Sequence, residues 1–263
     1  MAYLARLLAD DGYAVKSWCL EGAPNEGTPS EAMAAERIVL PVPLQRDGKL
    51  TGTKLPLGEL WPRLSPRQRV YAGAVPPDDR SRAEAMGLRV TDYFTDEALT
   101  VQNAVPTAEG AIAAAMEHLE VTLHGAPCLV VGFGRIGKLL AHDLAALGAK
   151  VSVSARRFDD FAWIDAFGYR ALHTERLAGK LGGFRAVFNT VPGMVLNDAL
   201  LAELRSDCVL VELASQPGID AEAAKARKLD YVKAAGLPGK AAPETAARAI
   251  RETLYRIWED EKA

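Results

Sequence analysis

Val130-Val131-Gly132-Phe133-Gly134-Arg135-Ile136-Gly137 is the stretch that decides the fold of this 263-residue chain. Its glycines have the spacing GxGxxG, follow the apolar run 128–131 and open a segment whose leucines recur with helical periodicity. In such a strand, turn and helix, Gly132 permits the tight turn, Gly134 lets the backbone approach a pyrophosphate, and Gly137 lets helix and strand pack closely. The stretch therefore predicts a dinucleotide-binding Rossmann unit, and a turn without a ligand is the alternative.

Strands and helices alternate from this motif to the end of the chain. We expect strands at 128–131, 150–154, 169–172, 186–189, 208–212 and 230–234, helices between them (among them 174–180 and 196–204), and a last helix at 243–259. The strands are nearly continuous apolar runs, which is typical of a parallel sheet covered on both faces. The sequence thus predicts an α/β fold with a doubly wound parallel Rossmann sheet at 126–240, followed by a C-terminal helical segment at 241–263.

The first hundred residues show the same alternation on a smaller scale. We expect a helix at 2–9 and strands at 14–20, 37–42, 69–72 and 88–92, separated by Pro, Gly and charged residues. Residues 1–101 are therefore predicted to form a smaller, flavodoxin-like α/β domain on the substrate side. Residues 102–125 would connect the two domains through a helix at 107–119, with Thr107 as its N-cap.

Composition indicates a globular protein. Hydrophobic residues make up 49% and charged residues 25%, and the net charge is -3 without a basic cluster, which argues against nucleic-acid binding. The apolar runs fall short of the roughly 20 residues that a membrane span requires, and the first residues do not resemble a signal peptide, so we expect a cytoplasmic location and no membrane. Cys19, Cys128 and Cys208 have no CxxC spacing and no nearby histidine, which predicts buried reduced thiols and no metal.

The end of the second Rossmann strand indicates the cofactor. An acidic residue there would bind the ribose of NAD, whereas an arginine would accommodate the 2′-phosphate of NADP. The chain has Ser154-Ala155-Arg156-Arg157 and no carboxylate before Asp159, so NADP is expected, with NAD as the alternative. Two later loops also follow strands, where doubly wound sheets bind ligands. The expected cofactor-binding residues are Gly132, Gly134, Arg135, Ile136, Gly137, Ser154, Arg156, Arg157, Asn189, Thr190, Val191, Pro192, Ala214 and Ser215.

With these residues assembled, the chain resembles the dipicolinate synthase A-subunit family. The resemblance rests on stretches between about residues 99 and 257, namely 103–110, 123–125, the glycine motif, 189–192, 213–215 and 236–239. It implies dehydrogenation of dihydrodipicolinate to dipicolinate with NAD(P)+ during sporulation. It also implies a partner, the flavoprotein-like second subunit of dipicolinate synthase, and we expect a homo-oligomer.

One departure from the family concerns the start of the chain. Family members begin with an additional strand and a Gly-Gly-Asp-x-Arg-Gln turn, whereas Met1 here stands at the first helix. We therefore expect the small domain to lack that strand and to leave strand edges unpaired.

The implied reaction needs a hydride acceptor, a base for the departing proton, and donors for the two carboxylates of the diacid substrate. The catalytic candidates are Glu109 and His118, and the substrate-binding candidates are Thr107, Ser215, Pro217, Gly236 and Pro238. Glu109 as a helix-start carboxylate and His118 as a surface residue are the alternative interpretations. The other functions considered are a D-2-hydroxyacid or alanine-type dehydrogenase and a non-catalytic NAD(P)-binding subunit.

Overall fold

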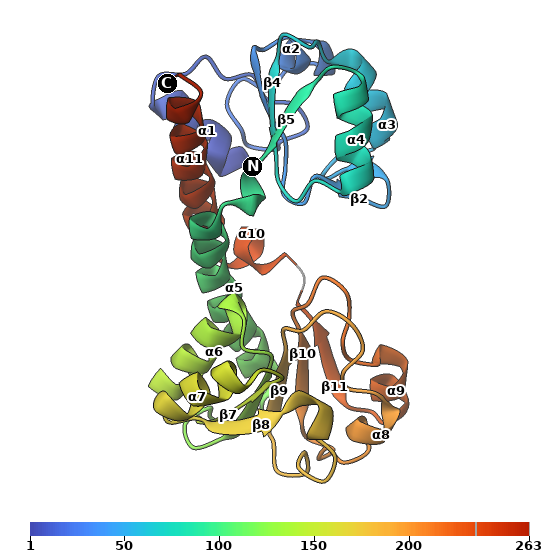
Figure 1. Cartoon of the computed structure of the whole chain (residues 1–263), viewed down its shortest axis with the longest axis vertical. Helices are drawn as coiled ribbons and strands as arrows, with labels where there is room; N and C mark the ends of the chain where they lie inside the picture. The colour runs from blue at the N-terminus through green and yellow to red at the C-terminus, as the bar shows by residue number, and fades with distance from the viewer. Residues whose placement is uncertain (235, 263) are drawn as a thin grey trace. The chain divides into compact units, whose positions relative to one another are not determined.

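The computed structural model describes residues 1–234 and 236–262. The chain divides into two compact units, one made of Met1–Asn103 with Pro243–Ala263 and the other of Ala104–Ala242. The C-terminal helix α11 (Pro243–Asp260) therefore belongs to the same unit as the N-terminal residues, from which it is distant in the sequence (Figure 1).

The second unit is built on a six-stranded sheet with the order β11-β10-β9-β6-β7-β8. All of its strand pairs are parallel. The strands are β6 (Pro127–Val131), β7 (Lys150–Ala155), β8 (Arg170–His173), β9 (Ala186–Asn189), β10 (Val209–Glu212) and β11 (Asp230–Lys233). The strand order reverses between β6 and β9, which is the topological switch point where doubly wound sheets bind ligands. The predicted Rossmann sheet is confirmed.

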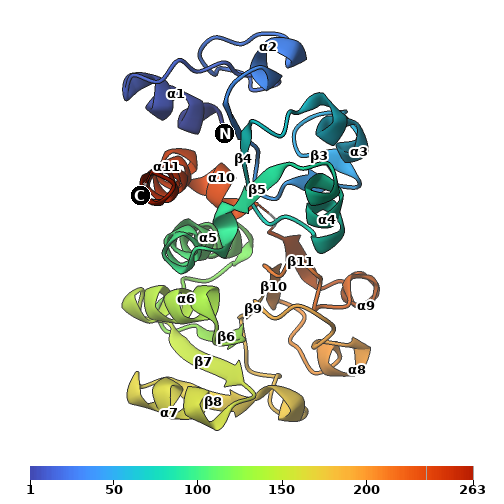
Figure 2. The same cartoon turned by 45° about the horizontal axis from the view of Figure 1, so that its top comes forward.

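Helices cover both faces of this sheet (Figure 2). They are α5 (Glu97–His118), α6 (Arg135–Ala146), α7 (Phe158–Ala166), α8 (Asp198–Leu201), α9 (Ala221–Ala226) and α10 (Leu237–Ala241), with a 3-10 turn, η3, at Thr174–Arg176. Side chains of β6 alternate between two cores: Val130 packs with α5 and α6, and Leu129 packs on the opposite face with α8 and α9. Because both faces are covered, the strands are apolar throughout, as the sequence pattern predicted.

The first unit contains a three-stranded parallel sheet with the order β1-β4-β5. Its strands are β1 (Arg37–Val39), β4 (Arg69–Ala72) and β5 (Arg89–Asp92), and a short antiparallel pair joins β2 (Gln45–Arg46) to β3 (Lys49–Leu50). Its helices are α1 (Ala2–Asp10), α2 (Pro29–Met33), α3 (Leu57–Leu60), α4 (Pro77–Ala85) and α11, with 3-10 turns η1 (Trp61–Arg63) and η2 (Tyr93–Thr95). Leu4 and Leu8 of α1 pack with Ile250 and Leu254 of α11 in a separate core.

The strand predicted at 14–20 is wrong. The segment forms a single isolated bridge, between Ser17 and Glu26, and Cys19 has a positive φ of 54° and an exposed side chain. A cavity of about 500 Å³ lies between residues 13–20 and β1, lined also by Leu4 and Trp258. Within the described residues β1 pairs with β4 alone, so its other edge faces this cavity. The cavity separates residues 14–20 from that edge of β1. The segment therefore makes no strand hydrogen bonds there and lies outside the sheet.

The helix ends also differ from the prediction in three places. Helix α5 begins at Glu97 and continues through Pro106, so Thr107 is a buried residue of the helix interior and not its N-cap. The helix predicted at 174–180 is only the η3 turn, and the one at 196–204 is only α8. A proline removes one backbone hydrogen bond, but buried side chains before and after it, Leu99 and Ala108, hold both halves of α5 in place.

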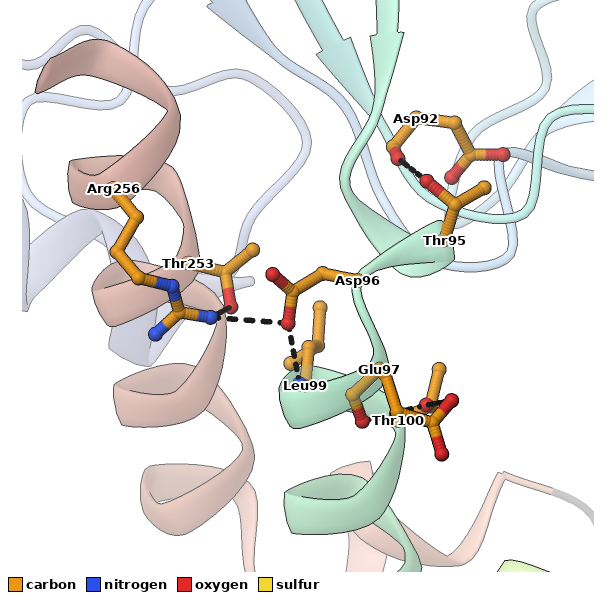
Figure 3. A network of polar contacts seen from close by, with 8 residues as sticks. All are labelled: Asp92, Thr95, Asp96, Glu97, Leu99, Thr100, Thr253 and Arg256. Carbon is orange, nitrogen blue, oxygen red and sulfur yellow. Dashed lines mark hydrogen bonds and ion pairs between the residues drawn. The ribbon is translucent and has the colours of Figure 1, made fainter. Parts of the chain in front are cut away.

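A polar network in the first unit fixes where α5 begins, and Figure 3 shows it. Asp96 Oδ1 accepts hydrogen bonds from the backbone N–H of Leu99 (2.8 Å) and from Nη2 of Arg256 on α11 (3.0 Å). Arg256 also donates to Thr253 Oγ1 at 3.1 Å. The backbone hydrogen bond from Leu99 holds the pKa of Asp96 below its usual range, with a further contribution from Arg256 and against the effect of partial burial. Asp96 thus caps the helix eleven residues before Thr107.

Candidate functional site

The glycine loop after β6 admits no side chain at two of its three glycines. Gly132 has a φ of +100°, and a Cβ there would lie 2.5 Å from Thr190 Oγ1 and 2.7 Å from Val191 Cγ2. A Cβ on Gly137 would overlap the carbonyl oxygen of Gly132. The loop therefore turns tightly onto β9, and α6 starts in direct contact with the loop backbone.

Gly134 is different, because it faces open space. It is the N-cap residue of α6, its backbone is extended, and a Cβ built on it would meet nothing within 4 Å. Gly134 has no side chain that could cap this 12-residue helix. The backbone N–H groups at the start of α6 therefore lie beside a stretch of backbone, at Gly134, that another molecule can approach closely. These features fit a pyrophosphate, which accepts hydrogen bonds from such amides.

The arginines after β7 lie on the surface of the same unit. Arg156 and Arg157 are both exposed, but Arg157 Nη2 lies 3.1 Å from Asp159 Oδ2. Arg156 takes part in no ion pair among residues 1–234 and 236–262. Ser154, by contrast, is buried: its carbonyl accepts from the Gly132 N–H (2.9 Å) and its Oγ accepts from Thr174 Oγ1 (3.2 Å). Ser154 therefore supports the glycine loop, and Arg156 is an exposed guanidinium at the end of β7 that Asp159 does not engage.

The loops after β9 and β10 are joined through buried polar groups. Asn189 Nδ2 donates to Glu212 Oε1 (2.8 Å) and to the carbonyl of Val191 (3.0 Å). Thr190 Oγ1 donates to the carbonyl of Val131 at 2.9 Å, which ties the β9 loop to β6. Asn189 and Thr190 therefore hold the loops of the candidate site in position through buried and half-buried hydrogen bonds.

Glu212 is a central residue of this arrangement that the sequence did not identify. Its side chain is 1% exposed, and both carboxylate oxygens accept backbone hydrogen bonds: Oε1 from Ala214 (2.9 Å), Oε2 from Gly218 (2.7 Å) and Ile219 (2.9 Å). The signal that could have found it is a lone carboxylate at the end of an apolar strand, because such a group needs several donors when it is buried.

The exposed residues of the two loops form the rim of the site. Pro192, Ser215 and Pro217 are exposed, and Val191 and Ala214 are partly buried. The loops contact each other directly, since the N–H of Val195 donates to the carbonyl of Gly218 at 2.8 Å. The structure thus brings the predicted residues 189–192 and 214–217 together next to the glycine loop.

Helices α5 and α10 carry four further candidates. Gly110 of α5 packs against α10, because a Cβ on it would lie 3.1 Å from Ala241 Cβ and from Leu237 Cδ2. Thr107 lies one turn earlier on α5, and Glu109 is exposed. At the start of α10, Gly236 is the N-cap in the left-handed region, with φ 70°, and Pro238 is in the first turn. Gly110 therefore joins α5 to α10 in the part of the chain that carries these candidates.

His118 lies apart from the other candidates. It is the last residue of α5, and its Nδ1 lies 2.8 Å from Oδ2 of Asp230, the first residue of β11. Asp230 is at the amino edge of the parallel sheet, whereas the glycine loop follows the carboxyl end of β6. In the part of the chain that the structure describes, no cluster of three or more His, Cys, Asp or Glu side chains could hold a metal ion. Nor is any described helix long and apolar enough to span a membrane.

Comparisons with known proteins agree with this geometry. A family model described as "Putative NAD(P)-binding" matches residues 119–219. The dipicolinate synthase A-subunit of Bacillus subtilis (strain 168) is 34% identical over 170 residues, which are 64% of this chain and 57% of that protein. The match thus spans less than two thirds of the relative's length.

Two solved structures are similar over nearly the whole chain. The dipicolinate synthase A-subunit from Bacillus halodurans has 27% identity and a TM-score of 0.85, and the similarity covers 97% of this chain and 93% of that one. The corresponding protein of dipicolinate synthase from Bacillus subtilis has 25% identity and a TM-score of 0.83, covering 98% and 92%. The resemblance predicted from the sequence is confirmed, and the chain contains a Rossmann domain of the NAD(P)-binding type.

Proposed function

We propose that this chain is an NADP-dependent oxidoreductase of the dipicolinate synthase type, which dehydrogenates dihydrodipicolinate to dipicolinate. The observation that carries the proposal is the open space at Gly134, the N-cap residue of α6, next to the joined loops after β9 and β10. The similarity of this chain to the dipicolinate synthase A-subunit supports the choice of reaction. A role in sporulation, a flavoprotein-like second subunit of dipicolinate synthase as partner, and self-association into a homo-oligomer are parts of the same proposal.

The preference for NADP rests on Arg156. No carboxylate follows β7 before Asp159, and Asp159 is itself engaged by Arg157. A 2′-phosphate beside the Arg156 guanidinium would gain charge-assisted hydrogen bonds, whereas a ribose hydroxyl there would find no acidic acceptor. The adenosine half of the cofactor is therefore assigned to β7, with the pyrophosphate at the first turn of α6.

The loops after β9 and β10 then receive the nicotinamide half and the substrate. When bound, the oxidised cofactor supplies the acceptor for a hydride from the dihydropyridine ring. The ring also loses one proton as it becomes aromatic, and the exposed carboxylate of Glu109 is the base that we assign to it. We assign the Ser215 hydroxyl and Thr107 to the substrate carboxylates, and Pro217, Gly236 and Pro238 to the surface around them. His118 is left out, because it lies at the other edge of the sheet.

Cofactor titration tests the proposal. We expect Arg156→Asp to weaken NADPH binding by about 10- to 100-fold, because a hydrogen bond to a charged group contributes about 1.5–3 kcal/mol. NADH binding should change little. Arg157→Asp is the matched control: that side chain already faces Asp159, so the effect on NADPH should be several-fold smaller. Equal losses for NADPH and NADH would show that Arg156 does not lie at the 2′-phosphate.

An activity assay tests the reaction itself. Dihydrodipicolinate generated in place should be oxidised by the wild-type chain with NADP+, and the absorbance of NADPH reports turnover, with and without the flavoprotein-like partner. Glu109→Gln should lower turnover while leaving NADPH affinity unchanged. Tight NADPH binding with no turnover in either condition would instead favour a non-catalytic cofactor-binding role.

A further inference from the structure

Glu212 is a buried carboxylate that pairs with no Lys or Arg side chain of the described residues. The carboxylate accepts four hydrogen bonds, from Asn189 Nδ2 and from the backbone N–H groups of Ala214, Gly218 and Ile219. All four partners are donors, so they satisfy an ionised carboxylate and offer no acceptor for a carboxyl proton. Within the described residues, no Lys or Arg side chain forms an ion pair with Glu212. The group is therefore an anion held by neutral dipoles.

The position of this charge follows from the topology. Glu212 is the last residue of β10, opposite Asn189 of β9 in the register of the sheet. A dinucleotide crosses the switch point with one nucleotide on each half of the sheet. Because Arg156 follows β7 in the first half, the second nucleotide belongs over β9 and β10, directly outside Glu212.

We propose that Glu212 makes this site bind the oxidised nicotinamide cofactor in preference to the reduced one. The inference rests on the proposed function. The nicotinamide ring is a cation when oxidised and neutral when reduced, so a fixed anion beneath it attracts only the oxidised form. In a buried, low-dielectric environment such attraction is stronger than in water. A dehydrogenase that starts from oxidised cofactor and must release the reduced form would benefit from that difference.

Tyr231 is a titratable neighbour of Glu212. Tyr231 lies on β11, which pairs with β10 so that Leu210 is opposite Tyr231. Burial raises the pKa of Tyr231, and the negative charge of Glu212 raises it further. The field of Glu212 thus extends beyond the groups that donate hydrogen bonds to it.

Glu212 has two effects that a test must separate. Its charge acts on the cofactor, and its four hydrogen bonds hold the loop after β10 in place. Gly218 illustrates how tightly that loop is packed: a Cβ there would lie 2.5 Å from Asn189 Nδ2 and 2.7 Å from the carbonyl of Val191. Loss of loop geometry should weaken both forms of the cofactor by the same factor. Loss of charge should change the ratio of the two affinities.

The experiment compares the dissociation constants of NADP+ and NADPH for wild type, Glu212→Gln and Glu212→Asp, measured by calorimetry on protein whose folding is checked by thermal unfolding. In Glu212→Gln we expect the preference for NADP+ over NADPH to fall about five- to tenfold. In Glu212→Asp, which keeps the charge but shortens the side chain, both affinities should fall and their ratio should stay at the wild-type value.

Two results would overturn the proposal: an unchanged ratio in Glu212→Gln, or an equal shift of the ratio in Glu212→Asp. If Glu212→Gln does not fold, Asn189→Ala replaces it. That change removes one donor from the carboxylate, so the preference for NADP+ should rise, and a fall or no change would contradict the inference. Wild-type protein that binds neither form would refute the proposed function itself, before any variant is compared.

Discussion

A single methyl group at Gly134 should weaken cofactor binding without unfolding the protein, whereas the same group at Gly137 should destabilise the fold. In Gly134→Ala the added carbon meets no atom within 4 Å, and the φ of -80° suits any residue. We therefore expect a melting temperature within about 4 °C of wild type, since exchanging Gly for Ala at an N-cap costs about 1 kcal/mol or less. The methyl group would occupy the approach to the first turn of α6, and NADPH affinity should fall by roughly tenfold or more.

Gly137→Ala is the matched variant. Its added carbon would overlap the Gly132 carbonyl oxygen and lie 3.0 Å from the Gly132 carbonyl carbon, so backbone must move. Overpacking of this kind costs about 1–3 kcal/mol, which corresponds to a loss of about 2–12 °C in melting temperature for a chain of this size. Differential scanning fluorimetry and NADPH titration on both variants provide the comparison. If folded Gly134→Ala binds NADPH as tightly as wild type, the pyrophosphate does not lie at α6.

Three further outcomes can be checked directly. Iodoacetamide at pH 8 should label exposed Cys19 and spare Cys128, whose pKa burial raises to about 12; equal labelling by peptide mass spectrometry would contradict this. Asp96→Ala should lower the free energy of unfolding by about 1 kcal/mol at pH 7. Because the folded pKa of Asp96 is lowered, its contribution is complete above the unfolded value and is lost as the pH falls below about 4, so urea titrations at pH 3 should show a smaller difference. Ala5→Leu, which extends into the cavity beside β1, should raise the melting temperature, whereas Ala83→Leu, fully buried away from that cavity, should lower it; a loss in both would indicate that the cavity cannot accept the side chain.

The parts of the fold that the sequence predicted are those with local signals. The turn at Gly132 needs a positive φ, and Gly137 needs close contact with the preceding turn. Only glycine meets both requirements, so the residue type at each position indicates the local structure. The strands of the second unit are apolar on both faces because helices cover both, and each run is bounded by loop residues. The alternation of strands and helices along the chain then predicts a parallel sheet with short connections.

The errors concern features that depend on distant partners. Residues 14–20 have the composition of a strand, but strand formation requires a neighbour, and the edge of β1 that faces them lies across a cavity. Thr107 follows a proline and resembles a cap, yet the helix starts at Glu97, and its cap is Asp96, which Arg256 of α11 contacts. Arg256 lies far from Thr107 in the sequence, so the local pattern around Thr107 could not indicate where the helix begins.

The two edges of the Rossmann sheet differ in how their polar groups are satisfied, and this difference favours the carboxyl edge as the place of the proposed site. Asn189 and Glu212 are 0% and 1% exposed, so each would be costly if unpaired. Loop N–H groups donate to both side chains, and the Asn189 amide donates to Glu212 and to the Val191 carbonyl, so these hydrogen bonds tie the loops after β9 and β10 together. At the amino edge the side chains of His118 and Asp230 are 38% and 45% exposed, and surface pairs of this kind contribute little to stability. A preorganised surface for a ligand therefore exists at the edge where burial and hydrogen bonding fix the backbone, and that edge includes Gly134.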